Sequence, residues 1–480
     1  MDRRTKGLEA DELRTAQELR QKASVRGARV ALSEVLAALS YALDLTEGQP
    51  IGHTIRTCLI GMRIAEEIGL SQEDRTALYY ALLLKDAGCS SNAAKMSALF
   101  GTDDRAVKPY MKFVDWHKRL GLAAKTALAV GRGRSIGERL SYFTSIARTE
   151  NVTRDLIAIR CERGADIVRR LGFPEASAEA VRSLDEHWNG MGHPAGLRGE
   201  EIPLLSRIAN ISQTIEAFFR NGGESAARSV VRARKGSWFD PKLVRVVQSW
   251  KGDREWWKNL TGPDAEALVM KEEPGSEQRV VDDSGLDVIA WAFSEIIDAK
   301  SPYTFRHSAN VAGFALAMAK QYGMDPVAQR RIHRAGLLHD IGKLGISNTI
   351  LDKPGRLDDA ERASIEQHPV FTSEILSHVE AFSDFAWTAA IHHEKLDGSG
   401  YPWRLTGDQL DDSARILCVA DVCEALTADR PYRAGMKPEA AFALMRREFA
   451  GKLCSTAVES LESCFARQPD WLAIRPDSIQ

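Results

Sequence analysis

The sequence predicts an all-α protein built from two tandem helical domains related by internal duplication. Apolar residues recur throughout the chain at the i, i+3, i+4 and i+7 spacing of amphipathic helices, as in Val311, Phe314, Ala315 and Met318. Alternating, strand-like runs are nearly absent. Residue patterns of the first half also return in the second half at a fixed distance, which indicates a repeat.

Helix boundaries support the same class. Gly69 and Gly323 are typical helix ends, and each precedes a residue that commonly caps the next helix. Those caps are Ser71, followed by acidic residues, and Asp325, followed by Pro326. The two glycines lie 254 residues apart (323 − 69), so the same pair of helices is predicted in both halves.

The duplication extends beyond these helices in two registers. Gly52-His53 corresponds to Arg306-His307, and Lys85-Asp86 corresponds to His339-Asp340, again at a distance of 254. Farther along, the distance becomes 208, since residues 189–194 correspond to residues 397–402. The first copy therefore carries 46 extra residues (254 − 208), which we place as an insertion at about 98–150.

Composition defines the broad class of the protein. A chain of 480 residues with 44% hydrophobic residues is long enough for two or three domains with sizeable cores. The formal net charge of -2 gives no general attraction to nucleic acid, so no DNA partner is expected. The seven cysteines are scattered without a CxxC pair, which indicates reduced thiols in a cytoplasmic protein. We find no signal peptide or membrane anchor, and expect no membrane partner.

The domain limits follow from the repeat and from loss of helical periodicity. Between the copies, the chain gathers Gly262-Pro263, Pro274-Gly275 and neighbouring acidic residues, which favours a linker. The predicted segments are a polar N-terminal segment (1–29), a first domain (30–251), a linker (252–283), a second domain (284–465) and a tail (466–480).

Metal-ligand chemistry is concentrated in the second half. His392-His393 runs into a glycine-rich turn closed by Pro402, and His339-Asp340 follows an apolar run. Asp421 lies within an apolar run, where a carboxylate is costly to bury unless it is paired or metal-bound. Each pattern alone also fits an ordinary capped helix, and their combination favours a metal centre. Further histidines of this half that could take part are His307 and His368.

These motifs, in this order, strongly resemble the HD-GYP family, a branch of the HD phosphohydrolase superfamily. The resemblance covers about residues 286–437. It rests on His339 to Lys343, Lys353 to Gly355, His368-Pro369, His392 to Pro402 and Asp421 to Arg433.

The family resemblance implies an α-helical domain with two or three metals, usually iron or manganese, that hydrolyses cyclic di-GMP. It implies that Asp340 bridges one metal, held by His307, His339 and Asp421, and a second one, held by His368, His392 and His393. Members with a third metal carry a glutamate four residues before the first histidine. Tyr303 occupies that position here, so we expect two divalent transition metals.

The same resemblance assigns substrate contacts. Asp340 and Lys343 are the expected catalytic residues, and Lys343 would contact a phosphate oxygen. Arg430 and Arg433 would clamp the other phosphate, with ordinary surface charge as the alternative. Tyr401 completes the expected substrate-binding set.

Two features of the second copy leave alternatives open. Family members often have Asp where Glu424 stands and Lys where Arg433 stands, and both changes alter the reach of the side chain. The loop from Gly398 to Pro402 resembles a segment that recruits partner proteins such as diguanylate cyclases. A turn that shapes the mouth of the site is an equal alternative.

The first copy has lost most of the predicted ligands. Only His53 and Asp86 remain, and two ligands cannot hold two metals. Lys85, beside Asp86, is expected to place an ammonium where a metal cation would lie. This domain could serve in homodimerisation, ligand sensing or partner docking. The lost positions are occupied by Lys85, Arg160, Leu184, Asp185 and Gln213.

The leading hypothesis is a metal-dependent phosphodiesterase that hydrolyses cyclic di-GMP to pGpG or GMP. Decay of one copy and the changes at Glu424 and Arg433 leave a signalling adaptor that does not hydrolyse nucleotide as the alternative. Hydrolysis of another cyclic dinucleotide by the same site is a third hypothesis.

Overall fold

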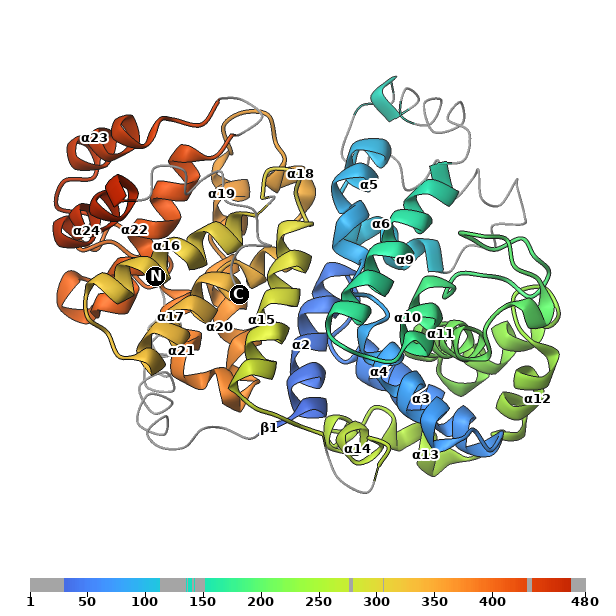
Figure 1. Ribbon diagram of the computed structural model, residues 1–480. Helices are drawn as coiled ribbons and strands as arrows, with labels where there is room; N and C mark the ends of the chain where they lie inside the picture. Colours follow the sequence, from blue (N-terminus) through green and yellow to red (C-terminus); the bar gives the residue numbers. More distant parts are fainter. Residues whose placement is uncertain are drawn as a thin grey trace, which may run out of the picture. The chain divides into compact units, whose positions relative to one another are not determined.

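The computed structural model describes residues 30–112, 135, 137–139, 142, 152–275, 279–304, 306–429 and 434–467. Within these ranges the secondary structure is helical except for two strands of two residues each (Figure 1), so the predicted all-α class is confirmed. Backbone contacts divide the described chain into two compact units. The first contains residues 30–281 and 347–352, and the second contains residues 282–346 and those from 353 onward.

The first unit is a bundle of helices closed by a small strand pair. Apolar faces of α3, α4 and α11 form its centre, with Leu78, Leu82 and Ile208 fully buried. Its elements are β1 (Val30–Ala31), α2 (Leu32–Thr46), α3 (His53–Glu67), α4 (Gln72–Leu84), α5 (Ala93–Phe100), α6 (Asp104–Lys112), α9 (Val152–Arg170), α10 (Glu175–Arg182), α11 (Leu204–Ala233), α12 (Pro241–Ser249), α13 (Arg254–Asn259), α14 (Ala265–Lys271), β2 (Val280–Val281) and α18 (Asn348–Leu351).

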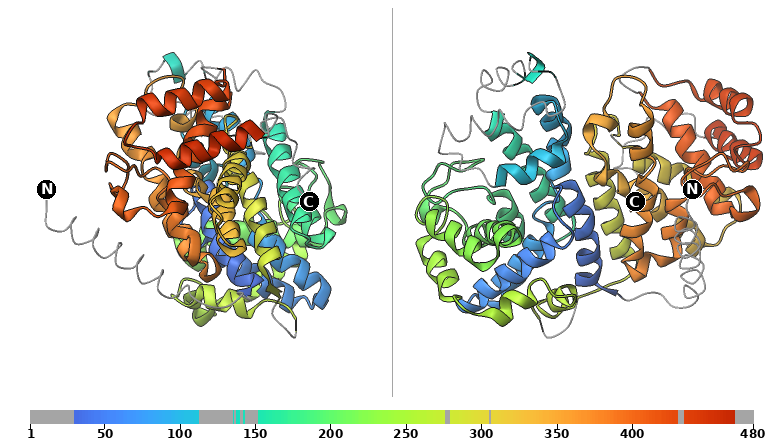
Figure 2. Two further views of the ribbon diagram at one scale, coloured as in Figure 1. Left: turned by 60° about the vertical axis from the view of Figure 1, so that its left-hand side comes forward. Right: turned by 180° about the vertical axis from the view of Figure 1, so that it is seen from behind.

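The segment that was predicted to be a linker is folded onto the first unit. Residues 252–281 carry helices α13 and α14, and α14 packs beside α3 in the first unit (Figure 2). Glu273 accepts hydrogen bonds from Ser33 Oγ and Tyr80 Oη, both at 2.7 Å. Strand β2 then pairs antiparallel with β1, with Val281 opposite Val30. Polar, glycine-containing composition suggested a loose connection, whereas specific hydrogen bonds hold this segment on the domain.

The second unit has the same kind of helical bundle. Helix α16 packs against both α17 and α22, and Phe314, Leu338 and Val419 are buried between them. Its elements are α15 (Asp283–Asp298), α16 (His307–Gln321), α17 (Pro326–Leu338), the 3₁₀ turn η3 (Ile341–Gly345), α19 (Asp359–Ile365), α20 (His368–Ser377), η4 (Glu380–Phe382), α21 (Ser383–Ala390), η5 (Gly407–Gln409), α22 (Asp412–Thr427), α23 (Pro438–Glu448) and α24 (Ser455–Arg467).

The two units repeat the same local structure at the predicted registers. Helices α3 and α16 begin at His53 and His307, and the glycines that end them, Gly69 and Gly323, have φ values of 68° and 69°. The expected caps are confirmed, since Ser71 Oγ accepts from Asp74 N–H at 3.1 Å. Asp325 likewise caps α17 through the N–H groups of residues 327 and 328.

The second register is repeated just as closely. Helix α11 begins 208 residues before α22, and a cis peptide precedes both Pro194 and Pro402. An isolated β-bridge joins Asn189 to Arg198 in the first unit, and its counterpart joins Asp397 to Thr406 in the second. The duplication inferred from sequence is therefore present in the fold.

Among the described residues, no helix is both long and apolar enough to cross a membrane. All seven cysteines are free thiols, and six of them are buried. The N-terminal segment 1–29, most of the predicted insertion and residues 468–480 of the tail lie outside the described residues.

Candidate metal centre

Five helices of the second unit bring the seven predicted ligands together. His307 is the first residue of α16, and His339-Asp340 follows the last turn of α17. His368 is the first residue of α20, and His392-His393 follows α21. Asp421 projects from the middle of α22. Helix ends therefore supply most of the ligands, and neighbouring residues of one helix end can face two metal positions.

Asp340 lies at the middle of the cluster. Its Oδ2 is 3.3 Å from His307 Nε2 and 3.4 Å from His339 Nε2. Its Oδ1 is 3.4 Å from His368 Nε2 and 3.7 Å from His392 Nε2. Each carboxylate oxygen thus faces a different pair of imidazoles. This is the arrangement expected of a carboxylate that bridges two cations.

Asp421 faces the same centre from α22. Its Oδ1 lies 3.5 Å from His307 Nε2, and its Oδ2 lies 3.5 Å from His393 Nδ1. The ligand atoms of His307, His339 and Asp421 lie within 4.8 Å of one another. The ligand atoms of His368, His392 and His393 also lie within 4.8 Å of one another.

Hydrogen bonds to the backbone fix three of the imidazoles. The Nδ1 atoms of His339, His368 and His392 lie 2.8, 2.6 and 2.7 Å from carbonyl oxygens three residues earlier in the chain. A carbonyl oxygen can only accept, so each Nδ1 carries the proton and each Nε2 presents its lone pair. All three lone pairs then point toward the space beside Asp340, which is the orientation that imidazole ligands of a metal need.

Burial and charge set the protonation of the cluster. Burial lowers the pKa of His368 to about 3, and it holds the pKa values of His392 and His393 well below their ordinary range. Burial also acts on His307, but the carboxylates of Glu424 and Asp340 outweigh it and raise its pKa to about 10. Burial opposes ionisation of Asp340, but His339 and Lys343 hold its pKa well below its usual range.

The residues fit a metal ion. Asp340 is fully buried, and its Oδ1 has no hydrogen-bond donor among the described residues. A buried carboxylate oxygen without a donor is costly, and a coordinated cation removes that cost. Imidazole nitrogens combined with carboxylate oxygens suit first-row transition metals better than magnesium or calcium, which prefer oxygen ligands.

The predicted substrate contacts are only partly described. Lys343 Nζ lies 2.5 Å from Asp340 Oδ2 and is partly exposed. The ring of Tyr401 lies 4.7 Å from that of His393. Both side chains therefore border the metal centre. Arg430 and Arg433 lie outside the described residues.

Glycines allow the chain to pass directly behind the ligands. A Cβ on Gly400 would lie 2.5 Å from Glu394 Cα and 2.7 Å from His393 O, so only glycine fits there. In the first unit, Gly192 makes the same approach to Glu186 and Asp185. The glycine turn thus supports the backbone that carries the histidine pair.

The structural roles of two buried glutamates of the site were not predicted. Glu394 accepts hydrogen bonds from the N–H groups of Trp403, at 2.8 Å, and Leu405, at 2.9 Å, and so anchors the glycine turn. Glu424 accepts from His307 Nδ1. A usable signal was present, because both glutamates recur 208 residues earlier, at positions 186 and 216, where the metal ligands have been lost.

In the first unit, ion pairs occupy the place of the metal centre. Lys85 Nζ contacts Asp86 Oδ2, and both side chains are buried, as the sequence predicted. Arg160, at the position of His368, contacts Asp185, at the position of His393. Positive side chains thus neutralise carboxylates that would otherwise bind a cation.

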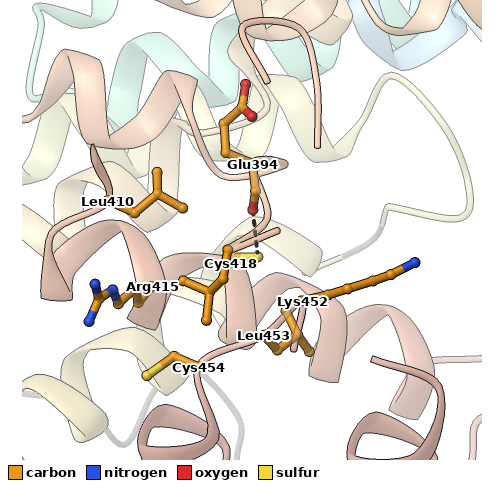
Figure 3. Close-up of a pocket in the computed structure, with 8 residues that line it drawn as sticks. Glu394, Leu410, Arg415, Cys418, Lys452, Leu453 and Cys454 are labelled. Carbon is orange, nitrogen blue, oxygen red and sulfur yellow. Dashed lines mark hydrogen bonds between the residues drawn. The ribbon is translucent and has the colours of Figure 1, made fainter. Parts of the chain in front are cut away.

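A small pocket beside α22 is separate from the metal centre. It is lined by Leu410, Arg415 and Cys418, and none of the seven predicted ligands contributes to it. Figure 3 shows the carboxylate of Glu394 directed away from Cys418, whose Sγ lies 3.4 Å from the Glu394 carbonyl oxygen. The carboxylate is instead engaged by the glycine turn.

Comparison with known proteins agrees with this geometry. A family model described as HD domain matches residues 138–243 and 292–452, one segment in each copy. The 3'3'-cGAMP-specific phosphodiesterase 3 of Vibrio cholerae is 42% identical over 452 residues, which cover 93% of this chain and 95% of that protein. A cyclic di-GMP phosphodiesterase of Pseudomonas aeruginosa is 39% identical over 134 residues, covering 28% of this chain and 32% of that protein.

A solved structure extends the comparison to the fold. The crystal structure of a cyclic GMP-AMP specific phosphodiesterase from Vibrio cholerae is 37% identical, has a TM-score of 0.62 and covers 94% of this chain and 100% of that one. Together with the ligand series around Asp340, these matches show that the chain belongs to the HD domain family, in its HD-GYP branch.

Proposed function

We propose that this chain is a metal-dependent phosphodiesterase that opens cyclic dinucleotides, with 3'3'-cGAMP as its preferred substrate. The observation that carries the proposal is Asp340, whose two carboxylate oxygens each face a separate pair of imidazoles. Such an arrangement suits two cations held a short distance apart, which is the usual device for hydrolysing an anionic phosphodiester.

The residues divide into two ligand sets that share Asp340. His307, His339 and Asp421 would hold one metal, and His368, His392 and His393 would hold the other. Bound cations would lower the pKa of a water between them and neutralise the phosphate. The donor set suits first-row transition metals in general, and the family resemblance favours iron or manganese among them.

The chain's own groups then have defined roles. Lys343, partly exposed beside Asp340, donates to a non-bridging phosphate oxygen and offsets its charge. Tyr401 borders the centre on the side of His393 and contacts the bound dinucleotide. Attack by water oxygen on phosphorus breaks the bond to the ribose 3'-oxygen, which takes a proton. The product of this single hydrolysis is the linear dinucleotide with a 5'-phosphate.

The proposed substrate changes the expectation drawn from sequence motifs, which was cyclic di-GMP. The relative that matches both copies of the repeat acts, by its name, on 3'3'-cGAMP. The cyclic di-GMP phosphodiesterases of Pseudomonas aeruginosa and Xanthomonas campestris each match only 28% of this chain. Similarity confined to one domain supports shared chemistry, and similarity over both domains supports a shared substrate. Cyclic di-GMP is therefore the second candidate.

The test combines metal analysis with product analysis on one anaerobic preparation. We expect two transition-metal ions per chain and conversion of 3'3'-cGAMP to a linear dinucleotide, faster than conversion of cyclic di-GMP. Asp340→Ala should abolish turnover of both. A fully loaded protein that hydrolyses neither compound would support the adaptor hypothesis instead. Faster turnover of cyclic di-GMP would reverse the substrate order.

A further inference from the structure

The four imidazoles around Asp340 differ in the group that contacts Nδ1, the ring nitrogen that faces away from Asp340. Three of them, on His339, His368 and His392, donate to neutral backbone carbonyl oxygens. The fourth, on His307, contacts the carboxylate of Glu424 through Nδ1. Within the described ranges, the set that contains His307 is the one with a second buried carboxylate behind an imidazole, so the two ligand sets differ in kind.

Glu424 is built into the same helix as a ligand of that set. It lies three residues after Asp421 on α22, so both side chains point to the same side of the helix. Its side chain is buried, with 1% of its surface exposed, and its Oε1 also accepts from Asn310 Nδ2 at 3.4 Å. The carboxylate is thus fixed between α16 and α22, where it orients the His307 ring.

The chemical effect of this contact follows from the proton that it shares. A carboxylate acceptor draws the Nδ1 proton away from the imidazole and makes Nε2 a stronger donor, which a neutral carbonyl does less well. The set of His307, His339 and Asp421 also contains a carboxylate of its own. The other set supplies three imidazoles and shares Asp340, and Asp421 faces it through its second oxygen, which lies 3.5 Å from His393 Nδ1.

From this asymmetry, we infer that the two metal positions are unequal. The position formed by His307, His339 and Asp421 binds its cation first and more tightly, and Glu424 is the positioning residue that sets the difference. The inference rests on the two-metal centre of the proposed function. It adds an order of loading, in which the second position fills only at higher metal concentration.

The first unit contains a matched control for a purely structural effect. His53 Nδ1 contacts Glu216 in the same way, although the metal ligands around it are lost. There, Arg56 Nε also donates to Glu216 Oε1 at 2.7 Å, so the carboxylate has a cation as partner. Loss of the Glu216 charge disturbs the buried contact between His53 and Glu216 without affecting a metal position.

The experiment is anaerobic calorimetric titration of the full chain, stripped with a chelator, with Mn²⁺. Wild type should bind two ions in two resolved steps. Glu424→Gln should weaken the tighter step by about 10-fold to 100-fold and leave the other step unchanged. Glu216→Gln should leave both steps unchanged. Equal weakening of both steps by Glu424→Gln, or no change in either, would overturn the inference.

A second pair of variants tests the order without changing Glu424. His368→Ala should retain the tighter step, and His307→Ala should lose it. The reverse pattern would overturn the inference even if Glu424→Gln fails to fold, which thermal unfolding of the metal-free protein would reveal. If wild type binds fewer than two ions, the two-metal centre itself fails. That result is distinct from two ions bound with equal affinity, which refutes only the order.

Discussion

Glu394 offers a sharp test of how the glycine turn supports the metal centre. Its carboxylate accepts two backbone N–H groups, at 2.8 and 2.9 Å, while 1% of the residue is exposed. Hydrogen bonds to a charged group contribute about 1.5–3 kcal/mol each. Glu394→Gln keeps one acceptor oxygen, loses the other and turns an amide NH₂ toward a backbone donor. We expect a loss of about 3 kcal/mol in the free energy of unfolding of the second domain.

The assay is scanning calorimetry of the metal-free chain together with product analysis of the loaded one. A loss of about 3 kcal/mol lowers the melting temperature of a domain of this size by roughly 6–12 °C. Activity should fall at least about tenfold, because the turn positions Tyr401 beside His393 and small displacements are costly in catalysis.

The repeat provides the control for this prediction. Glu186 accepts three backbone N–H groups of the corresponding turn, from Ala195, Gly196 and Leu197. Glu186→Gln should therefore lower the stability of the first domain to a similar degree while the metal content stays at the wild-type value. If Glu394→Gln melts and turns over like wild type, the carboxylate is not the anchor of the turn and the reasoning is wrong.

Three further predictions follow from buried charges. The pKa of His307 is raised to about 10, so metal binding must displace its proton. The affinity for Mn²⁺ should therefore rise about tenfold per pH unit between pH 7 and 8 in calorimetric titrations. An affinity that does not change with pH would contradict this prediction. Burial raises the pKa of Asp44 from 3.8 to about 7. Between these two pKa values the folded state binds the proton and the unfolded state does not, so the contribution of Asp44 to the free energy of unfolding falls as pH rises. Asp44→Asn should therefore reduce the difference in the free energy of unfolding between pH 4.5 and pH 7, measured by denaturant titration. Lys85→Met removes the ammonium beside Asp86 and should lower the free energy of unfolding of the first domain by about 3 kcal/mol with unchanged metal content; equal stability would show that the pair contributes nothing.

Much of the fold could be predicted because it depends on sequence patterns between residues that are close in the chain. Helical periodicity, the caps at Ser71 and Asp325 and the fixed registers depend on residues close together in the chain. The clustering of the seven candidate residues could be anticipated because buried His and Asp side chains are typical of metal sites, and their role as ligands stays a prediction.

The parts that could not be predicted depend on contacts between distant residues. The sequence marks Glu424 as a departure from the family pattern, but its contact with His307, 117 residues away, appears only in the folded structure. Glu273 belongs to a polar stretch whose composition predicts a linker, and its hydrogen bond from Tyr80 appears only in the folded structure. The choice among cyclic dinucleotides stays a prediction, because the motifs relate to the phosphate chemistry and not to the bases.

The strand pair of the first unit has a consequence for how such a chain can arise and be handled. Val30 pairs with Val281, so the points where the chain enters and leaves this domain lie side by side. A module whose ends meet can be copied, excised or inserted within another gene without pulling its own fold apart. The strand pair makes residues 30–281 the natural continuous fragment of the first unit to express alone, without α18 from residues 347–352.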